Sequence, residues 1–188
     1  MKVKTSYKDL RTLDFDIETV ATGFGDPQWV PQKVTCIAWS WIGSDHVAWS
    51  TDLDETLSDL PMMDPFLEAY AEADMVTGHN LIRFDLPVLN GECLRRHMAP
   101  LGPKLVQDTM RIVKTKGLKK GQDNVGALLR VPNPKMPLSW QEWQDAYEEK
   151  GWKTVIDRCC DDVLKHKVMR QRMIDNGWLR PPTHWRPR

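Results

Sequence analysis

The sequence predicts an α/β fold in three layers, with a central sheet between helices. Two observations predict it. The N-terminal third contains short runs in which apolar and polar residues alternate, as in strands, and the rest alternates between helical patterns and short apolar runs. We expect one domain across residues 1–188, with a core over about 11–176 and a poorly anchored tail rich in Pro, Arg and Trp at 177–188.

The first half of the chain is expected to begin the sheet. Residues 33–42 and 46–50 flank the turn Gly43-Ser44-Asp45, which favours an antiparallel hairpin. The spacing of Met62, Phe66, Leu67 and Tyr70 predicts an amphipathic helix over 61–73. The strands expected here are 11–17, 33–42 and 46–50.

The second half alternates strands and helices. Asn80 is the expected N-cap of a helix that runs to about His97, and Gly177 ends the last helix. Asp108 and Thr109 are interpreted as a pair at a strand end or helix cap. The expected strands are 75–78 and 104–106, and the expected helices are 79–97, 125–129, 140–150 and 152–176. This order is compatible with a five-stranded, mixed, ribonuclease H-like sheet flanked by helices.

Composition limits the possible partners and compartments. The formal net charge is zero, so a nucleic-acid partner has to be held by local patches rather than by a global field. The four cysteines show neither metal-ligand nor disulfide spacing. No signal peptide and no membrane-spanning apolar run is present, which predicts a cytoplasmic protein without a membrane partner.

Two carboxylates in the first strand carry the first indication of chemistry. Asp16 and Glu18 are two residues apart, so both leave the same face of a strand. Like charges at this separation repel, and a hard divalent ion between them resolves the repulsion. The alternative is an acidic strand face that points to solvent.

Two further acidic residues stand on expected helices. Asp85 falls in a first helical turn, where a carboxylate also complements the helix dipole. In the last helix, the apolar stripe places Asp161 nearly opposite the buried face and Asp162 at its border. Asp162 is therefore the better candidate to reach the sheet, and four carboxylates of this kind can hold two divalent ions.

Three motifs in this order resemble the DEDD (DnaQ-like) 3′–5′ exonuclease superfamily. They are Asp16-Ile-Glu18-Thr19, Gly78-His-Asn-x-x-x-Phe-Asp85 and Arg158-Cys-Cys-Asp-Asp162-Val163. The resemblance covers about residues 11–173 and is nearest to the proofreading domains of phage and of family A or B polymerases.

The resemblance implies a specific activity. Asp16, Glu18, Asp85 and Asp162 are then the catalytic metal ligands for two Mg²⁺ or Mn²⁺ ions, and nucleoside monophosphates are released from the 3′ end of single-stranded or frayed DNA. A separate DNA polymerase is the implied partner, because no polymerase domain is present. The residues implied to contact substrate are Thr19, His79, Asn80, Phe84 and Arg158.

The third motif departs from the family. Where the family carries a tyrosine four residues before the last aspartate, or a histidine five before it, this chain has Arg158 and Asp157. Arginine is not a base at neutral pH, but it can pair with the scissile phosphate or with Asp162. His166 is a candidate substitute base, and a histidine that is satisfied near the core is the alternative.

Alternative functions therefore remain open. A degenerate member of the family binds nucleic acid or a polymerase without cutting, and an RNA-directed exonuclease or an endonuclease shares the same fold. Two basic segments are candidate contacts to nucleic acid or a polymerase. They are Lys114, Lys116, Lys119 and Lys120, and in the tail Trp178, Arg180, Trp185, Arg186 and Arg188.

Overall fold

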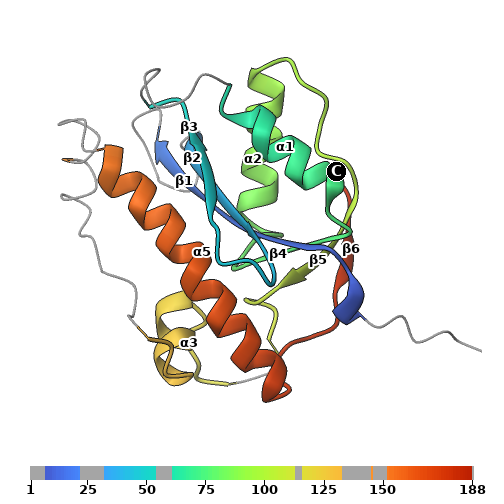
Figure 1. Ribbon diagram of the computed structural model, residues 1–188, viewed down its shortest axis with the longest axis vertical. Coiled ribbons are helices and arrows are strands. Elements are labelled where there is room, and N and C mark those ends of the chain that lie inside the picture. Colours follow the sequence, from blue (N-terminus) through green and yellow to red (C-terminus); the bar gives the residue numbers. More distant parts are fainter. Residues whose placement is uncertain are drawn as a thin grey trace, which may run out of the picture.

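The computed structural model describes residues 7–21, 32–53, 61–112, 116–132, 145 and 152–187. A six-stranded mixed sheet crosses the molecule in the order β3-β2-β1-β4-β5-β6 (Figure 1). The strands are β1 (Thr12–Ala21), β2 (Gln32–Trp41), β3 (Ala48–Thr51), β4 (Met75–Gly78), β5 (Lys104–Asp108) and β6 (Thr183–Trp185).

The sheet joins an antiparallel half to a parallel half at β1. β1 pairs with β2, and β2 with β3, in antiparallel register. β1 pairs with β4, and β4 with β5, in parallel register, and β6 then returns antiparallel to β5. β1 is therefore central, and its residues meet neighbours from both halves.

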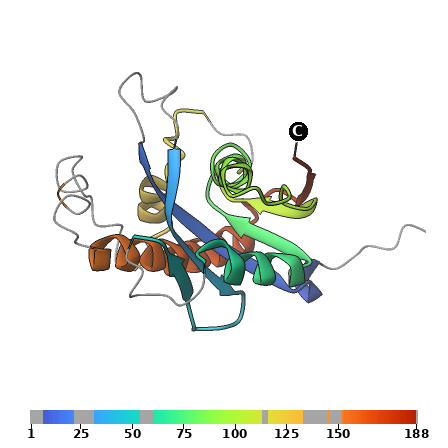
Figure 2. The same ribbon diagram turned by 90° about the horizontal axis from the view of Figure 1, so that it is seen from above.

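Helices cover both faces of the sheet. The larger core cluster packs α1 (Met63–Glu72) and α2 (Asp85–Arg95) against one face, and a second cluster packs α5 (Trp152–Asp175) against the other (Figure 2). α3 (Gln122–Leu128) joins α5 in a third, smaller cluster, and a single 3₁₀ turn, Tyr7–Asp9, precedes β1. The expected three-layer architecture is confirmed.

The strand count differs from the expected five. The sixth strand comes from the tail, which was expected to be poorly anchored. Instead, Thr183 to Trp185 pair with Val106 to Lys104 at the edge of β5, and Trp185 packs against the larger core cluster. A bridge between Ile112 and Leu179 secures the approach to this strand.

The helix after β4 begins later than expected. α2 starts at Asp85, and Asn80 has a φ of 73°, so Asn80 is a turn residue rather than an N-cap. Its carbonyl accepts bonds from the amides of Arg83 and Phe84. Asn tolerates positive φ better than most residues, which explains its place in this turn.

Some expectations fall outside the described residues. The helix predicted over 140–150 lies there except for Asp145, and so does Lys114. Among the helices that the structure describes, none is long and apolar enough to cross a membrane.

Candidate metal centre

β1 divides its side chains between the two faces of the sheet. Leu13, Phe15 and Ile17 are buried in the larger core, on the side of α1 and α2. The alternate residues face α5, because side chains of a strand point to opposite faces in turn. Asp14 and Asp16 thus lie beside α5, where the Cys159 thiol donates to the backbone carbonyl of Asp16.

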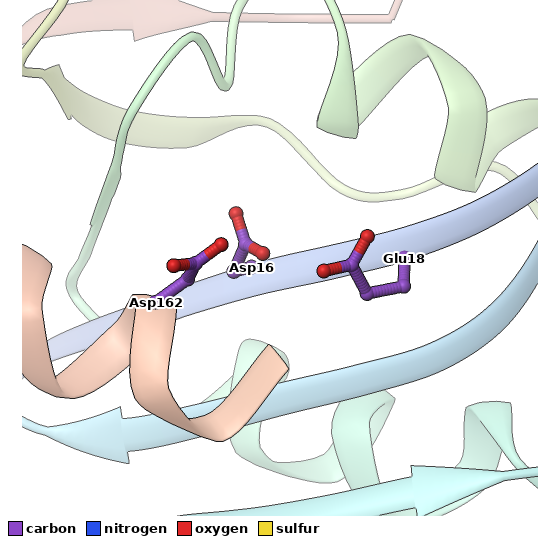
Figure 3. A group of neighbouring side chains, drawn as sticks. All are labelled: Asp16, Glu18 and Asp162. Atoms are coloured by element: carbon purple, nitrogen blue, oxygen red, sulfur yellow. The ribbon is translucent and has the colours of Figure 1, made fainter. Parts of the chain in front are cut away.

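Three carboxylates meet between β1 and α5. One oxygen from each of Asp16, Glu18 and Asp162 lies within 4.8 Å of the others. Figure 3 shows the side chains of Asp16 and Asp162 directed toward the same space, with Glu18 further along β1. Asp162 is buried, with 1% of its surface exposed, while Asp16 and Glu18 are partly exposed. The cluster therefore has a deep end on α5 and an open end on β1.

The donor set suits a hard divalent ion. All three donors are carboxylate oxygens, which are the ligands that Mg²⁺ and Mn²⁺ prefer. Ligands at about 2.1 Å from a common ion are at most about 4.2 Å apart, so oxygens within 4.8 Å of one another need only a small approach to share one. This acidic group can hold a metal ion.

Asp85 lies beside this cluster but outside the group of three. The pKa of the Asp85 carboxyl is raised from 3.8 to about 8, chiefly by burial. The carboxylates of Asp108 and Glu18 contribute to this rise, while hydrogen bonds from the backbone amides of Asp85 itself and Ile17 oppose it. Such a carboxyl holds a proton near neutral pH and becomes a full ligand only when a cation replaces that proton.

Arg158 contacts Glu18 rather than Asp162. Its Nε lies 3.2 Å from Glu18 Oε1, and both side chains are mostly buried. The sequence indicated Asp162 or a phosphate as the partner of Arg158. The ion pair seen in the structure is with Glu18 instead. The guanidinium instead stands at the open end of the acidic cluster, where it partly neutralises Glu18.

His166 is buried and both of its ring nitrogens are engaged in a hydrogen-bond network. Its Nδ1 lies 2.7 Å from Asp14 Oδ2, and its Nε2 lies 2.9 Å from the Thr109 hydroxyl. The same hydroxyl lies 2.9 Å from His79 Nδ1, and His79 Nε2 donates to the carbonyl of Lys120. This geometry favours the satisfied histidine over the base, and it ties α5, β5 and the loop after β4 together.

Asp108 fixes the loop that leads to Asp85. Its carboxylate accepts bonds from the backbone amides of Asn80, Ile82 and Met110. The pair Asp108-Thr109 does stand at a strand end, since β5 ends at Asp108. Its side chains organise the neighbouring loop, and this role was not predicted.

The remaining candidate contacts lie around the same edge. Thr19 follows Glu18 at a shift in the register of β1 and β2 and is half-buried. Phe84 precedes α2 with 37% of its surface exposed, which leaves the ring accessible. Lys116 and Lys119 are exposed, so the described part of the basic run is open to solvent.

Two residues beside the acidic cluster, Asp14 and Asp108, were not predicted from the sequence to take part in the site. Asp14 was interpreted only as one of the outward acidic residues of β1, and Asp108 only as a strand end or cap. The spacing of Asp14 and His166 relates them to the carboxylates. Asp14 lies two residues before Asp16 on β1, and His166 lies four residues after Asp162 on α5. The contact between Asp14 and His166 therefore repeats the β1–α5 contact one step along both elements.

Comparison with known proteins places the fold. No protein-family model matches the chain, and no curated protein matches it. Among solved structures, the chain is similar to the family B DNA polymerase from the hyperthermophilic archaeon Pyrobaculum calidifontis, with a TM-score of 0.65 and 17% identity. The match covers 88% of this chain and 24% of that polymerase, so this chain spans about a quarter of its length.

At this identity the likeness concerns the fold alone. Together with the sheet order, it confirms the predicted α/β fold of ribonuclease H-like type, with six strands instead of five. The acidic group of Asp16, Glu18 and Asp162 stands within that fold.

Proposed function

We propose that this chain is a metal-dependent 3′–5′ exonuclease that acts on single-stranded or frayed DNA ends. One observation carries the proposal. Asp16 and Glu18 on β1 and Asp162 on α5 are far apart in sequence, yet their oxygens converge within 4.8 Å. These carboxylates belong to the motifs that resemble the DEDD superfamily, and the fold is similar to that of a polymerase of the class that the motifs indicated.

In this proposal, Asp16, Glu18 and Asp162 hold metal ions, with Asp85 completing the set from α2. Two Mg²⁺ or Mn²⁺ ions, when bound, supply an activated water on one side of the phosphodiester and stabilise the leaving oxygen on the other. The chain itself contributes the rigid placement of the ligands. β1 fixes two carboxylates, and the Asp14–His166 contact holds α5 in register with them.

Arg158 takes a different part from the tyrosine of the resembled family. A guanidinium does not accept a proton at neutral pH, and its ion pair with Glu18 places it at the open end of the site. From there it binds the phosphate at the scissile position. His79, Asn80, Phe84 and Thr19 line the edge where the terminal nucleotide is expected.

A second function from another class is favoured by the same arginine. The Arg158 guanidinium competes with a metal ion for Glu18. If the guanidinium prevents metal binding, the chain is a degenerate member that only binds nucleic acid or a polymerase. The acidic cluster argues against this alternative, because carboxylates that face phosphates weaken binding unless a cation stands between them. For an active enzyme, the role that we propose is proofreading beside a separate polymerase.

The direct test is hydrolysis of a 5′-labelled single-stranded DNA with Mg²⁺, Mn²⁺ or EDTA. We expect a metal-dependent ladder that shortens from the 3′ end and is lost in Asp16→Asn and Asp162→Asn. Asp161→Asn is the matched control, because Asp161 is adjacent to Asp162, is exposed and forms an ion pair with Lys165 on α5. An RNA of the same sequence, and a circular single strand, distinguish the sugar preference and internal cutting.

The opposite result is also informative. If the wild type binds DNA but produces no ladder with any metal, the protein is catalytically inactive. If Asp161→Asn and Asp162→Asn lose activity equally, the assignment of Asp162 as the metal ligand on α5 is contradicted.

A further inference from the structure

A second hollow lies away from the carboxylates, between α2, β6 and the loops beside them. Its volume is about 650 Å³. β6 forms the edge of the sheet beside β5 (Figure 1). Arg186 and Pro187, which follow β6, also line the hollow. The lining residues are Ile82, Pro87, Asn90, Arg111, Thr183, His184, Trp185, Arg186 and Pro187. We call this hollow the tail pocket.

The charge of the tail pocket is one-sided. Its lining includes Arg111, Arg186 and His184, and among the residues that the structure describes it includes no Asp or Glu. This is notable in a chain whose formal net charge is zero. The pocket is thus complementary to an anion, and Arg binds phosphate through paired N–H donors.

The lining also contains apolar residues. Trp185 is half-buried, since part of it packs against the larger core while it also lines the pocket. Ile82, Pro87 and Pro187 add apolar surface. A lining with an aromatic residue and two arginines suits single-stranded nucleic acid, because bases stack on aromatic rings and phosphates contact the cations.

Arg111 is held in place by neighbouring residues. Arg111 Nη1 donates to the Thr183 hydroxyl at 3.3 Å, which joins the loop after β5 to the start of β6. The Arg111 amide also donates to the Asp108 carbonyl. A guanidinium has five N–H donors, so one bond to Thr183 is compatible with binding a phosphate as well.

The tail pocket connects with the acidic site through one loop. Ile82 lines the pocket, and its amide is held by the Asp108 carboxylate. Asp85, three residues later, is buried and receives a bond from the Ile17 amide of β1. The loop between β4 and α2 therefore borders the tail pocket at Ile82 and approaches β1 at Asp85.

We propose that the tail pocket binds a single-stranded segment of the substrate upstream of its 3′ end. A base stacks on Trp185, and the neighbouring phosphates contact Arg111 and Arg186. This inference rests on the proposed function for the identity of the substrate. It assigns to the tail a role in holding the nucleic acid, separate from the metal ligands.

The test measures binding without cleavage. Fluorescence anisotropy in EDTA, which prevents metal-dependent cleavage, measures the affinity for a single-stranded DNA of about 12 nucleotides. We expect Arg186→Ala and Arg111→Ala each to weaken this binding by about 3- to 10-fold and to lower the salt slope by about one.

Lys153→Ala is the matched control, because Lys153 is an exposed cation on α5. Thermal melting excludes loss of the fold in each variant. Binding by both arginine variants that equals that of Lys153→Ala overturns the proposal. If the arginine variants bind DNA more weakly but the wild type does not cut DNA, the tail pocket is supported and the exonuclease proposal fails. If the wild type cuts DNA but the arginine variants bind DNA normally, the exonuclease proposal stands and the tail pocket fails.

Discussion

At the scale of single residues, the ion pair between Arg158 and Glu18 is the feature that sets this site apart from the resembled family. The two groups lie 3.2 Å apart and are partly shielded from water. A metal ion that approaches Glu18 therefore meets a positive charge already in place. The same charge attracts a phosphate, so Arg158 affects metal binding and DNA binding in opposite directions.

Replacing Arg158 by Met is expected to separate these effects. In the absence of DNA, Mn²⁺ binding strengthens about fivefold, because a pair of this kind contributes on the order of 1 kcal/mol. DNA binding weakens at the same time. Isothermal titration with Mn²⁺ and anisotropy with DNA measure the two, and Arg158→Lys is the control that keeps the charge. A fall in Mn²⁺ affinity in Arg158→Met contradicts this account.

The second prediction for a single residue concerns Thr109. Its hydroxyl contacts both His79 and His166. Thr109→Val leaves two buried imidazoles short of a partner, and this costs about 1–3 kcal/mol for each group affected. Thr77→Val is the matched control, since the Thr77 hydroxyl is equally buried and donates to a single carbonyl, that of Gln107. Urea unfolding should show the larger loss for Thr109→Val; equal losses mean that the shared network contributes nothing special.

The sequence predicted part of this site and missed part of it. Helical periodicity separated Asp162 from Asp161, and the structure buries Asp162 while the Asp161 side chain stays 59% exposed. Asp14 was not predicted as part of the site, because its partner, His166, lies 152 residues away. The spacing of Asp14 from Asp16 and of His166 from Asp162 indicates this contact only once β1 and α5 are known to pack together.

At the scale of elements, Gly78 determines how closely β4 approaches β1. A Cβ atom added there would stand 2.7 Å from the backbone oxygen of Phe15, the residue before Asp16, and 2.6 Å from Leu81. The glycine of the second motif therefore permits a close approach of two backbones beside the candidate metal ligands of β1.

Gly78→Ala is therefore expected to lower the free energy of unfolding by about 1–3 kcal/mol, as overpacking does, and to weaken metal binding through displacement of β1. Gly91→Ala is the control, because nothing lies within 4 Å of a Cβ at Gly91 in α2, and Ala stabilises a helix interior by about 0.5–1 kcal/mol relative to Gly. Thermal and urea unfolding distinguish them; a stabilised Gly78→Ala variant refutes the close-approach explanation.

The elements themselves were largely predictable, and their ends were not. The helix expected over 61–73 is α1, Met63–Glu72, and the last helix, expected over 152–176, is α5, Trp152–Asp175. The helix expected from His79 starts at Asp85, because Asp108 holds the amides of Asn80 and Ile82 in a turn. A distant carboxylate thus overrides the local helical pattern.

At the scale of the whole molecule, the three-layer α/β architecture followed from the order of strands and helices. The sixth strand did not. β6 contains only three residues, Thr183–Trp185, and it forms because the edge of β5 offers partners. A segment this short has no recognisable strand pattern, so the tail was expected to be loose.

The buried Asp85 carboxyl links global stability to pH. Its pKa rises from 3.8 to about 8 on folding, so between these values the folded protein holds a proton that the unfolded chain has released. Stability of the metal-free protein is therefore expected to be highest at low pH within this window and to fall as pH rises through about 8. Thermal melting in EDTA from about pH 5 to about pH 9 measures this, and Asp85→Asn should flatten the slope; an unchanged slope contradicts it.

The most direct measurement for the metal centre is Mn²⁺ binding by electron paramagnetic resonance to the wild type, Asp162→Asn and Asp161→Asn. Three converging carboxylates predict that Asp162→Asn weakens binding by about 10-fold or more, as loss of a charged ligand does, and that Asp161→Asn binds as the wild type does. Equal affinity in Asp162→Asn and the wild type would mean that the acidic cluster of β1 and α5 is not a metal centre.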